Sequence, residues 1–256
     1  MDVEIIRGRN AVLEVLRSPS RHVIELIVRK SSNDPRLRTA VEIARRRGIK
    51  VVFQGAEELD RLAEGRKHQG IIAIASPIRY IPLEEIIDRA FLSEREPLIV
   101  VLDHIQDPHN LGAIIRTAEA VGAHGVVIPK RRAAGVTPTV VKVSSGATDH
   151  IPIARVSNIA ITLERLKERG IWVVGLIPDA EQTIYQIDMT VPLSLVIGSE
   201  GKGLSKLVSE RCDMLVSIPM FGDIGSLNAS VAAGVALYEA VRQRISSPQG
   251  RLSHTP

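Results

Sequence analysis

Apolar runs of strand length alternate along the chain with segments whose apolar residues recur every three or four positions. The first pattern is typical of buried strands, and the second is typical of amphipathic helices. In the first part of the chain we expect helices over 10–18, 34–48 and 56–65 and strands over 22–30, 49–53 and 70–77. Asp34 followed by Pro35 is a typical helix start. This alternation predicts a small α/β domain of two or three layers.

A second alternation begins near residue 97 and continues to residue 244. Its strands are almost continuously apolar, which is typical of a parallel sheet covered by helices on both faces. We expect strands over 97–105, 125–129, 171–178, 193–200 and 214–220 and helices over 110–122, 158–170, 204–213 and 229–244. The predicted fold class is therefore α/β, with a parallel sheet in the second part of the chain.

A short amphipathic pattern over 83–94 separates the two alternating segments, and Pro82 and Pro97 bracket it. We interpret residues 78–97 as a linker between domains. The predicted organisation is a first domain over 1–77, the linker over 78–97, a second domain over 98–246 and a disordered tail over 247–256.

The overall composition limits the class of protein. The chain is 45% hydrophobic and 24% charged, which is typical of a water-soluble globular protein. Its apolar runs are shorter than the ~20 residues that span a bilayer, and its first residues lack the pattern of a signal peptide. Cys212 is the single cysteine and has no histidine near it in sequence, so we interpret it as a buried small residue. We expect a cytoplasmic protein with no membrane partner.

Positive charge is concentrated in the first part of the chain. Residues 1–77 contain 15 basic and 10 acidic residues, whereas residues 96–256 contain 15 of each. A basic domain can bind a polyanion such as RNA, or it can simply present a solvated surface. Aromatic residues make up only 3% of the chain, which argues against a base-stacking RNA surface.

The stretch IGSEGKGLS at 197–205 lies between a predicted strand and a predicted helix. Its glycine spacing is neither that of a Walker phosphate-binding loop nor that of a dinucleotide fingerprint. Glu200 at its centre would repel a phosphate, so a cationic or zwitterionic ligand fits this loop better. A tight turn that binds no ligand is the alternative interpretation.

Four residues that could bind a metal, namely Asp103, His104, Asp107 and His109, precede the next predicted helix. Their spacing is irregular across a loop that contains proline, so we predict no metal site.

Two further polar residues belong to the helix predicted over 110–122. Asn110 is suited to cap this helix. Arg116 lies six residues further along, and its simplest role is a surface pair with Glu119.

The segment FGDIGSLNAS at 221–230 leads into the last predicted helix. Ser226 is suited to cap that helix, which would place Asn228 inside the first turn, where Asn is a mediocre helix former. Capping would thus explain Ser226 but not Asn228. The helix is rich in alanine, so it can pack closely against another element or against a second subunit.

Three stretches, taken in order, resemble the motifs of the SpoU family of SPOUT methyltransferases. They are DPHNLGAIIRTAEAVGAHGVVIP, LVIGSEGKGLS and SIPMFGDIGSLNASVAAGVALYEA. IRGRNAVLEVL and KHQGIIAIAS resemble parts of the ribosomal-protein-like RNA-binding domain of the same family. The resemblance covers almost the whole chain, and it is greatest to the branch that methylates the 2'-hydroxyl of a guanosine in 23S ribosomal RNA.

The resemblance implies a fold, a cofactor and an assembly. The parallel sheet would end in a deep C-terminal trefoil knot, which is a rare exception to ordinary connectivity. The protein would be a homodimer with the final helix in its interface, and it would bind S-adenosylmethionine. The implied cofactor-binding residues are Leu176, Ile197, Gly198, Ser199, Gly201, Ile218, Met220 and Leu227.

The implied reaction is a displacement in which a ribose 2'-hydroxyl attacks the methyl carbon of the sulfonium. The implied catalytic residues are Asn110, Arg116, Glu200, Ser226 and Asn228. Arg116 would activate the hydroxyl or, because a guanidinium rarely gives up its proton, would hold an adjacent phosphate. The other four residues would orient the ribose, Arg116 and the cofactor.

Two other functions stay open on the sequence. A tRNA could replace ribosomal RNA as the substrate, although the long basic N-terminal domain favours ribosomal RNA. The chain could also be a non-catalytic RNA-binding factor in ribosome assembly, which would need no S-adenosylmethionine.

Overall fold

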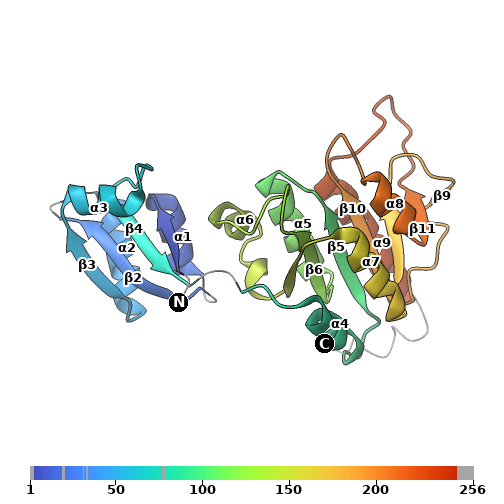
Figure 1. The fold of residues 1–256 in the computed structure, drawn as a ribbon, viewed down its shortest axis with the longest axis horizontal. Coiled ribbons are helices and arrows are strands. Elements are labelled where there is room, and N and C mark those ends of the chain that lie inside the picture. The colour runs from blue at the N-terminus through green and yellow to red at the C-terminus, as the bar shows by residue number, and fades with distance from the viewer. Residues whose placement is uncertain (1–2, 19–20, 31, 33, 77–78, 247–256) are drawn as a thin grey trace. The chain divides into compact units, whose positions relative to one another are not determined.

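A computed structural model describes residues 3–18, 21–30, 32, 34–76 and 79–246 (Figure 1). The chain divides into two compact units, Met1–Arg79 and Tyr80–Pro256, and each unit has its own sheet and core. The tail predicted over 247–256 lies outside the described residues.

The first unit is built on a mixed sheet with the strand order β1-β4-β2-β3. Its elements are β1 (Glu4–Arg7), α1 (Arg9–Arg17), β2 (Val23–Arg29), α2 (Pro35–Arg46), β3 (Lys50–Gln54), α3 (Ala56–Ala63) and β4 (Ile71–Ala75). Successive residues of a strand face opposite sides of its sheet. Leu26 packs in the core with α1 and α2, whereas Ile27 packs with α3 on the other face. The unit is therefore an α/β domain of three layers, and the sequence predicted either two or three.

Asp34 begins α2 as predicted. Its carboxylate accepts a hydrogen bond of 2.8 Å from the backbone N–H of Arg36, and Pro35 occupies the first helical position.

The second unit contains a sheet of seven strands in the order β7-β6-β5-β10-β8-β11-β9, and every neighbouring pair is parallel. Its strands are β5 (Leu98–Asp103), β6 (Gly125–Pro129), β7 (Ile153–Val156), β8 (Trp172–Leu176), β9 (Gln182–Thr183), β10 (Leu193–Gly198) and β11 (Met214–Ser217). Its α-helices are α4 (Leu83–Phe91), α5 (Pro108–Ala120), α6 (Pro138–Val143), α7 (Ile159–Glu168), α8 (Lys206–Arg211) and α9 (Ala229–Ser246), with a 3-10 helix, η1, at Ala147–Asp149. The predicted parallel sheet is confirmed.

Helices cover both faces of this sheet. Ile99 and Val101 of β5 pack in one core with α4, α7 and α8. The intervening residues Val100 and Leu102 face the other side and are equally buried. On that side α5 contacts β6, α9 contacts β10, and the two helices pack against each other.

The prediction of a linker over 78–97 is wrong for most of that segment. Leu83, Ile86 and Ile87 of α4 are buried in the core of the second unit, and Ile81 pairs with Ala154 beside β7. Burying an aliphatic side chain of this size contributes roughly 1.5–3 kcal/mol, so α4 is held by the core and does not connect domains freely. The described part of the segment belongs to the second unit.

Several short elements were not predicted, notably β7, β9 and α6. The strand order leaves the deep knot untested, so the knot stays a prediction. Within the described residues, no helix is both long and apolar enough to cross a membrane.

Candidate functional site

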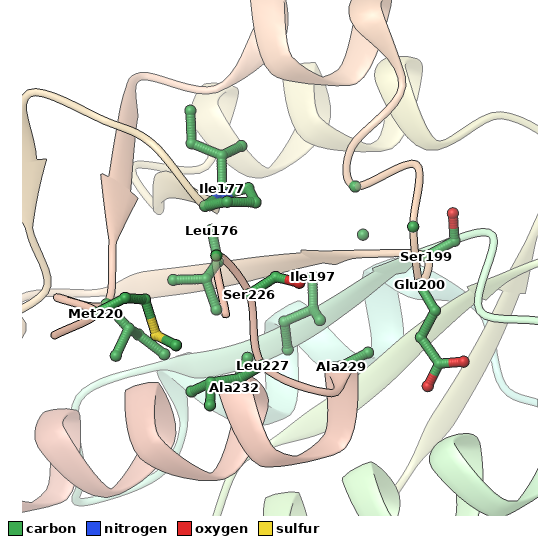
Figure 2. Close-up of a pocket in the computed structure, with 16 residues that line it drawn as sticks. Leu176, Ile177, Ile197, Ser199, Glu200, Met220, Ser226, Leu227, Ala229 and Ala232 are labelled. Atoms are coloured by element: carbon green, nitrogen blue, oxygen red, sulfur yellow. The ribbon is translucent and has the colours of Figure 1, made fainter. Parts of the chain in front are cut away.

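A pocket lies at the carboxyl ends of β8 and β10, beside the start of α9 (Figure 2). Figure 2 shows Leu176 and Ile177 on one side of it and Ala229 and Ala232 of α9 on the other. The carboxyl ends of parallel strands are the usual place for a ligand crevice in α/β proteins. All eight residues predicted to bind the cofactor line this pocket, namely Leu176, Ile197, Gly198, Ser199, Gly201, Ile218, Met220 and Leu227.

The walls of the pocket are mostly apolar, with a few polar groups at the rim. The side chains with polar groups among the lining residues are Ser199, Glu200 and Ser226. Such a combination is typical of sites that bury an apolar part of a ligand and orient it by a few hydrogen bonds. Six other lining residues were not predicted, and each lies within four positions of a predicted site residue: Ile177, Pro178, Gly203, Gly225, Ala229 and Ala232.

The glycine loop after β10 is both a tight turn and a wall of the pocket. A Cβ atom on Gly198 would lie 2.1 Å from the carbonyl carbon of Gly203, so only glycine fits there. Ser199 and Gly203 close the turn with two backbone hydrogen bonds of 3.0 and 2.8 Å. The two interpretations of this loop, turn and ligand site, are therefore compatible.

Asp103 ties the end of β5 to the glycine loop. Its carboxylate is 1% exposed and accepts a hydrogen bond of 2.7 Å from the backbone N–H of Ser205. The other carboxylate oxygen lies 2.5 Å from Nδ1 of His104. This residue thus positions the loop that lines the pocket. Within the described residues, no group of three or more His, Cys, Asp or Glu residues could hold a metal ion.

Asn110, Glu200 and Asn228 meet in one hydrogen-bonded group at the pocket rim. Oε1 of Glu200 accepts hydrogen bonds from Nδ2 of Asn110 and, at 2.8 Å, from Nδ2 of Asn228. Asn110 is only 7% exposed, and Oδ2 of Asp107 also accepts from its amide at 3.4 Å. Hydrogen bonds to a charged acceptor are stronger than neutral ones. The structure therefore brings together residues from α5, the glycine loop and the start of α9.

Both helix caps predicted near these residues are wrong. α9 begins at Ala229, so its N-cap is Asn228, whose Oδ1 accepts a hydrogen bond of 2.9 Å from the N–H of Ser230. Ser226 precedes the helix and lines the pocket. The single amide of Asn228 caps α9 with its oxygen and binds Glu200 with its nitrogen.

At α5 the cap is Asp107, which accepts a hydrogen bond of 2.9 Å from the N–H of His109. Asn110 lies inside the first turn, because the helix begins at Pro108.

Arg116 is the one predicted catalytic residue that the structure does not bring to the pocket of its own chain. It is exposed on α5 and is not among the lining residues. Six residues along a helix correspond to ~9 Å of rise and ~240° of rotation, so Arg116 points away from Asn110. No hydrogen bond or ion pair of its side chain occurs among the described residues, so the pair predicted with Glu119 does not form.

Cys212 is partly buried, and its thiol donates a hydrogen bond of 3.3 Å to the carbonyl of Val208. Burial, assisted by the charge of Asp213, raises the pKa of Cys212 to about 12. The thiolate is the nucleophilic form, so this residue is unsuited to nucleophilic catalysis at neutral pH.

Comparisons with known proteins agree with this geometry. Residues 97–238 match the SpoU rRNA Methylase family, and residues 5–81 match the family described as RNA 2'-O ribose methyltransferase substrate binding. The chain is 46% identical to the 23S rRNA (guanosine-2'-O-)-methyltransferase RlmB of Pseudomonas putida, over 94% of this chain and 97% of that protein. It is 44% identical to the protein of the same name from Photorhabdus laumondii, over 95% and 99% of the two chains.

A solved structure of a SpoU methyltransferase is also similar to this chain. The SpoU methyltransferase AviRb from Streptomyces viridochromogenes, in complex with the cofactor AdoMet, superimposes with a TM-score of 0.70 at 29% identity, over 96% of this chain and 92% of that chain. The family matches cover both units, and the sequence identities extend over nearly the whole chain. This chain therefore belongs to the SpoU rRNA methylase family, as its motifs predicted.

Proposed function

We propose that this protein transfers a methyl group from S-adenosylmethionine to the 2'-hydroxyl of a guanosine in 23S ribosomal RNA. The observation that carries the proposal is the convergence of Asn110 and Asn228 on Glu200 at the rim of the pocket. Relatives named for this reaction align over almost the whole chain, including the first unit. These relatives are bacterial, so we also propose that the protein acts in the cytoplasm, where bacterial ribosomes are assembled.

The pocket has the chemistry that S-adenosylmethionine requires. Leu176, Ile197 and Leu227 offer apolar surface for the adenine ring. The carboxylate of Glu200 supplies negative charge at the rim, which suits a cation and a zwitterion. When bound, S-adenosylmethionine supplies a methyl group on a positively charged sulfur, which an oxygen nucleophile can attack.

Glu200 and its two amide partners work as one unit in this proposal. Two amide groups hold Oε1, so the carboxylate has one orientation before any substrate arrives. The other oxygen, Oε2, is unpaired within the described part of the chain and is available to accept a hydrogen bond from the ribose. Fixed groups that orient a reacting hydroxyl lower the barrier because their positioning entropy is already lost on folding.

We further propose that Arg116 reaches the site from a second copy of the chain. Arg116 is exposed on α5, and α5 packs against α9. The loop before α9 exposes 99% of Phe221, and α9 itself exposes Val231 and Tyr238. Val231 and Tyr238 are seven residues apart and so share one face of α9. Exposed apolar side chains on one helix face are typical of an interface. A homodimer built on α9 would cover them and bring the neighbouring surface of α5 close to the partner.

Methylation assays test the proposed reaction. The purified protein is incubated with S-adenosylmethionine and with 23S ribosomal RNA or tRNA, and the modified ribose is then mapped. We expect one methylated guanosine in 23S ribosomal RNA. Transfer to neither RNA would contradict the function, and transfer to tRNA alone would contradict the substrate.

The role of Arg116 has its own test. Arg116→Ala is expected to lower kcat at least ~100-fold, the effect of removing one transition-state contact, while S-adenosylmethionine binding by calorimetry stays unchanged. Mixing Arg116→Ala with Glu200→Ala should restore activity, because a mixed dimer has one site with both residues intact. Failure to restore activity in proven mixed dimers would contradict a site shared between subunits.

A further inference from the structure

The loop that follows β6 carries three consecutive cations, Lys130, Arg131 and Arg132. All three residues are exposed. Within the described residues, none of the three side chains forms a hydrogen bond or an ion pair. Since residues 96–256 contain as many acidic as basic residues, these cations are a local excess of charge rather than part of a generally basic unit.

Backbone hydrogen bonds fix both ends of this basic loop. The N–H of Lys130 donates to the carbonyl of Val156 at 2.7 Å, and the N–H of Ala134 donates to the carbonyl of Ile105 at 2.8 Å. The guanidinium of Arg155 donates to the carbonyl of Lys130 at 3.0 Å. A loop whose backbone is already held in this way loses little backbone conformational entropy when it binds a partner.

The backbone of the loop is also strained at one cation. Arg132 has a φ of 57°, in the left-handed region that non-glycine residues rarely occupy. Such a conformation is unfavourable for an arginine and persists only where the surrounding structure imposes it. The conformation of the basic loop at Arg132 is therefore imposed by the surrounding structure.

The basic loop lies at the same edge of the sheet as Glu200. β6 neighbours β5, and β5 neighbours β10, all in parallel. Lys130 directly follows β6, while Gly198 ends β10 two residues before Glu200. Two strand spacings correspond to ~10 Å, so the start of the loop and the pocket rim are close neighbours.

We propose that Lys130, Arg131 and Arg132 bind the phosphate backbone of the RNA beside the ribose that is methylated. The inference rests on the proposed function, because that function supplies the RNA. Arginine and lysine bind phosphodiesters by charge-assisted hydrogen bonds, and such contacts position a strand without reading its sequence. Arg155, stacked 5.4 Å from the ring centre of Tyr80, adds a fourth cation beside the loop.

A triple variant tests the inference. Lys130→Ala, Arg131→Ala and Arg132→Asn remove the three charges together, and Asn tolerates the left-handed backbone at position 132. We expect binding to a 23S ribosomal RNA transcript to weaken at least ~10-fold. Each lost phosphate contact lowers the slope of log K against log salt by ~0.7, so the slope should fall by about 2. The effect should appear mainly in KM, because these contacts exist before and during the reaction.

A matched control removes three charges elsewhere in the same unit. Arg89→Gln, Arg165→Gln and Arg211→Gln alter exposed cations on α4, α7 and α8 and should leave RNA binding within about twofold of the parent. S-adenosylmethionine binding should be unchanged in both triple variants, which excludes a general loss of structure.

The outcomes distinguish this inference from the proposed function. An active parent protein whose basic-loop variant binds RNA equally well, with the same salt slope, would overturn the inference alone. A parent protein that methylates no RNA would overturn both. If the variant loses binding only to poly-glutamate and not to RNA, the basic loop serves an acidic protein and the inference is wrong.

Discussion

The strands of the seven-stranded sheet all begin on one side, here called its amino edge, and all end on the other, here called its carboxyl edge. These two sides use polar residues in different ways. At the amino edge, the guanidinium of Arg244 donates hydrogen bonds of 2.6–3.0 Å to four backbone carbonyls just before β5 and β10, those of Glu96, Pro97, Met189 and Val191. His124, just before β6, accepts a hydrogen bond of 3.0 Å from the N–H of Leu98. Here the polar side chains satisfy the protein's own backbone.

At the carboxyl edge, Asp103 also binds the protein's own backbone, but the pocket rim and the basic loop keep polar groups with capacity for a ligand. Glu200 is held by two amides at one oxygen, and the basic loop presents three exposed cations. From this comparison we infer that residues at the amino edge mainly stabilise the fold, whereas residues at the carboxyl edge mainly serve binding. Substitutions at the carboxyl edge should therefore lower activity at little expense in stability, and substitutions at the amino edge should do the reverse.

The largest effect is expected from Glu200→Ala, at the carboxyl edge. The variant loses the group that orients the site, so kcat/KM for methyl transfer should fall ~10²-fold or more. Its free energy of unfolding should fall by only about 1 kcal/mol, since one buried amide, that of Asn110, loses a partner. RNA methylation rates and urea unfolding measure the two quantities.

Two comparisons sharpen this prediction. Glu200→Gln keeps an oxygen that can accept from both amides, so it separates the loss of charge from the loss of position. Glu210→Ala removes an exposed carboxylate from α8, 3.9 Å from Lys206, and should change neither quantity. Full turnover by Glu200→Ala would refute the role of this group.

The reverse pattern is expected from Arg244→Met, at the amino edge. Three partly buried carbonyls and the exposed carbonyl of Glu96 lose a charged donor, so the free energy of unfolding should fall by about 3 kcal/mol. Trp172, the only tryptophan, lies in the second unit, so its fluorescence reports the unfolding of that unit. As a control, Arg89→Met breaks an exposed ion pair on α4 and should change the free energy of unfolding by less than about 0.5 kcal/mol.

Well below the unfolding temperature, kcat/KM of Arg244→Met should stay within twofold of the parent. A large loss of activity in a still-folded variant would break the proposed separation of the two edges.

A smaller effect concerns pH. Burial, with the nearby charges of Arg95 and Arg244, lowers the pKa of His124 to about 4, from 6.5 in an exposed residue. The folded protein thus favours neutral imidazole, so this contribution is fully present above pH 6.5 and is lost as the pH falls toward 4. Allowing for solvent screening of a ring that is only partly buried, the loss is about 1–2 kcal/mol.

His124→Asn isolates this effect. Asparagine can accept the hydrogen bond from Leu98 but does not titrate. The variant's free energy of unfolding should change less than the parent's between pH 6.5 and pH 4. An identical pH dependence in the two proteins would show that other groups are responsible.

Sequence patterns predicted most of the pocket, but not the geometry of its rim. Family motifs fix which residues follow each strand, so the eight predicted cofactor residues fall at strand ends that share one edge. The predictions of the helix caps of α5 and α9 were wrong because the position of a helix end depends on the conformation of a single turn. Asp107 followed by Pro108 repeats the signal of Asp34 and Pro35, which correctly predicted the start of α2. The same Asp-Pro pair would have predicted the start of α5 correctly.

Tertiary contacts decided the features that the sequence pattern left open. The amphipathic stripe of α4 was visible, but only the fold shows that the stripe packs against β7 and makes the supposed linker part of the core. β7 itself has only four residues, Ile153–Val156, too few for a clear alternation. Arg116 sits within a family motif, yet the sequence does not say which face of α5 it occupies in relation to the pocket.

The hydrogen bonds that converge on Glu200 also set an order of events during synthesis. Asn110 and Glu200 are separated by 90 residues, and Asn228 follows Glu200 by another 28. Domains fold as the chain emerges, with the N-terminal part first. The first unit can thus fold while the second unit is incomplete and the rim still lacks its last amide. A nascent chain therefore gains methyl-transfer competence only after α9 has been translated, so unfinished chains do not modify the RNA of the ribosomes around them.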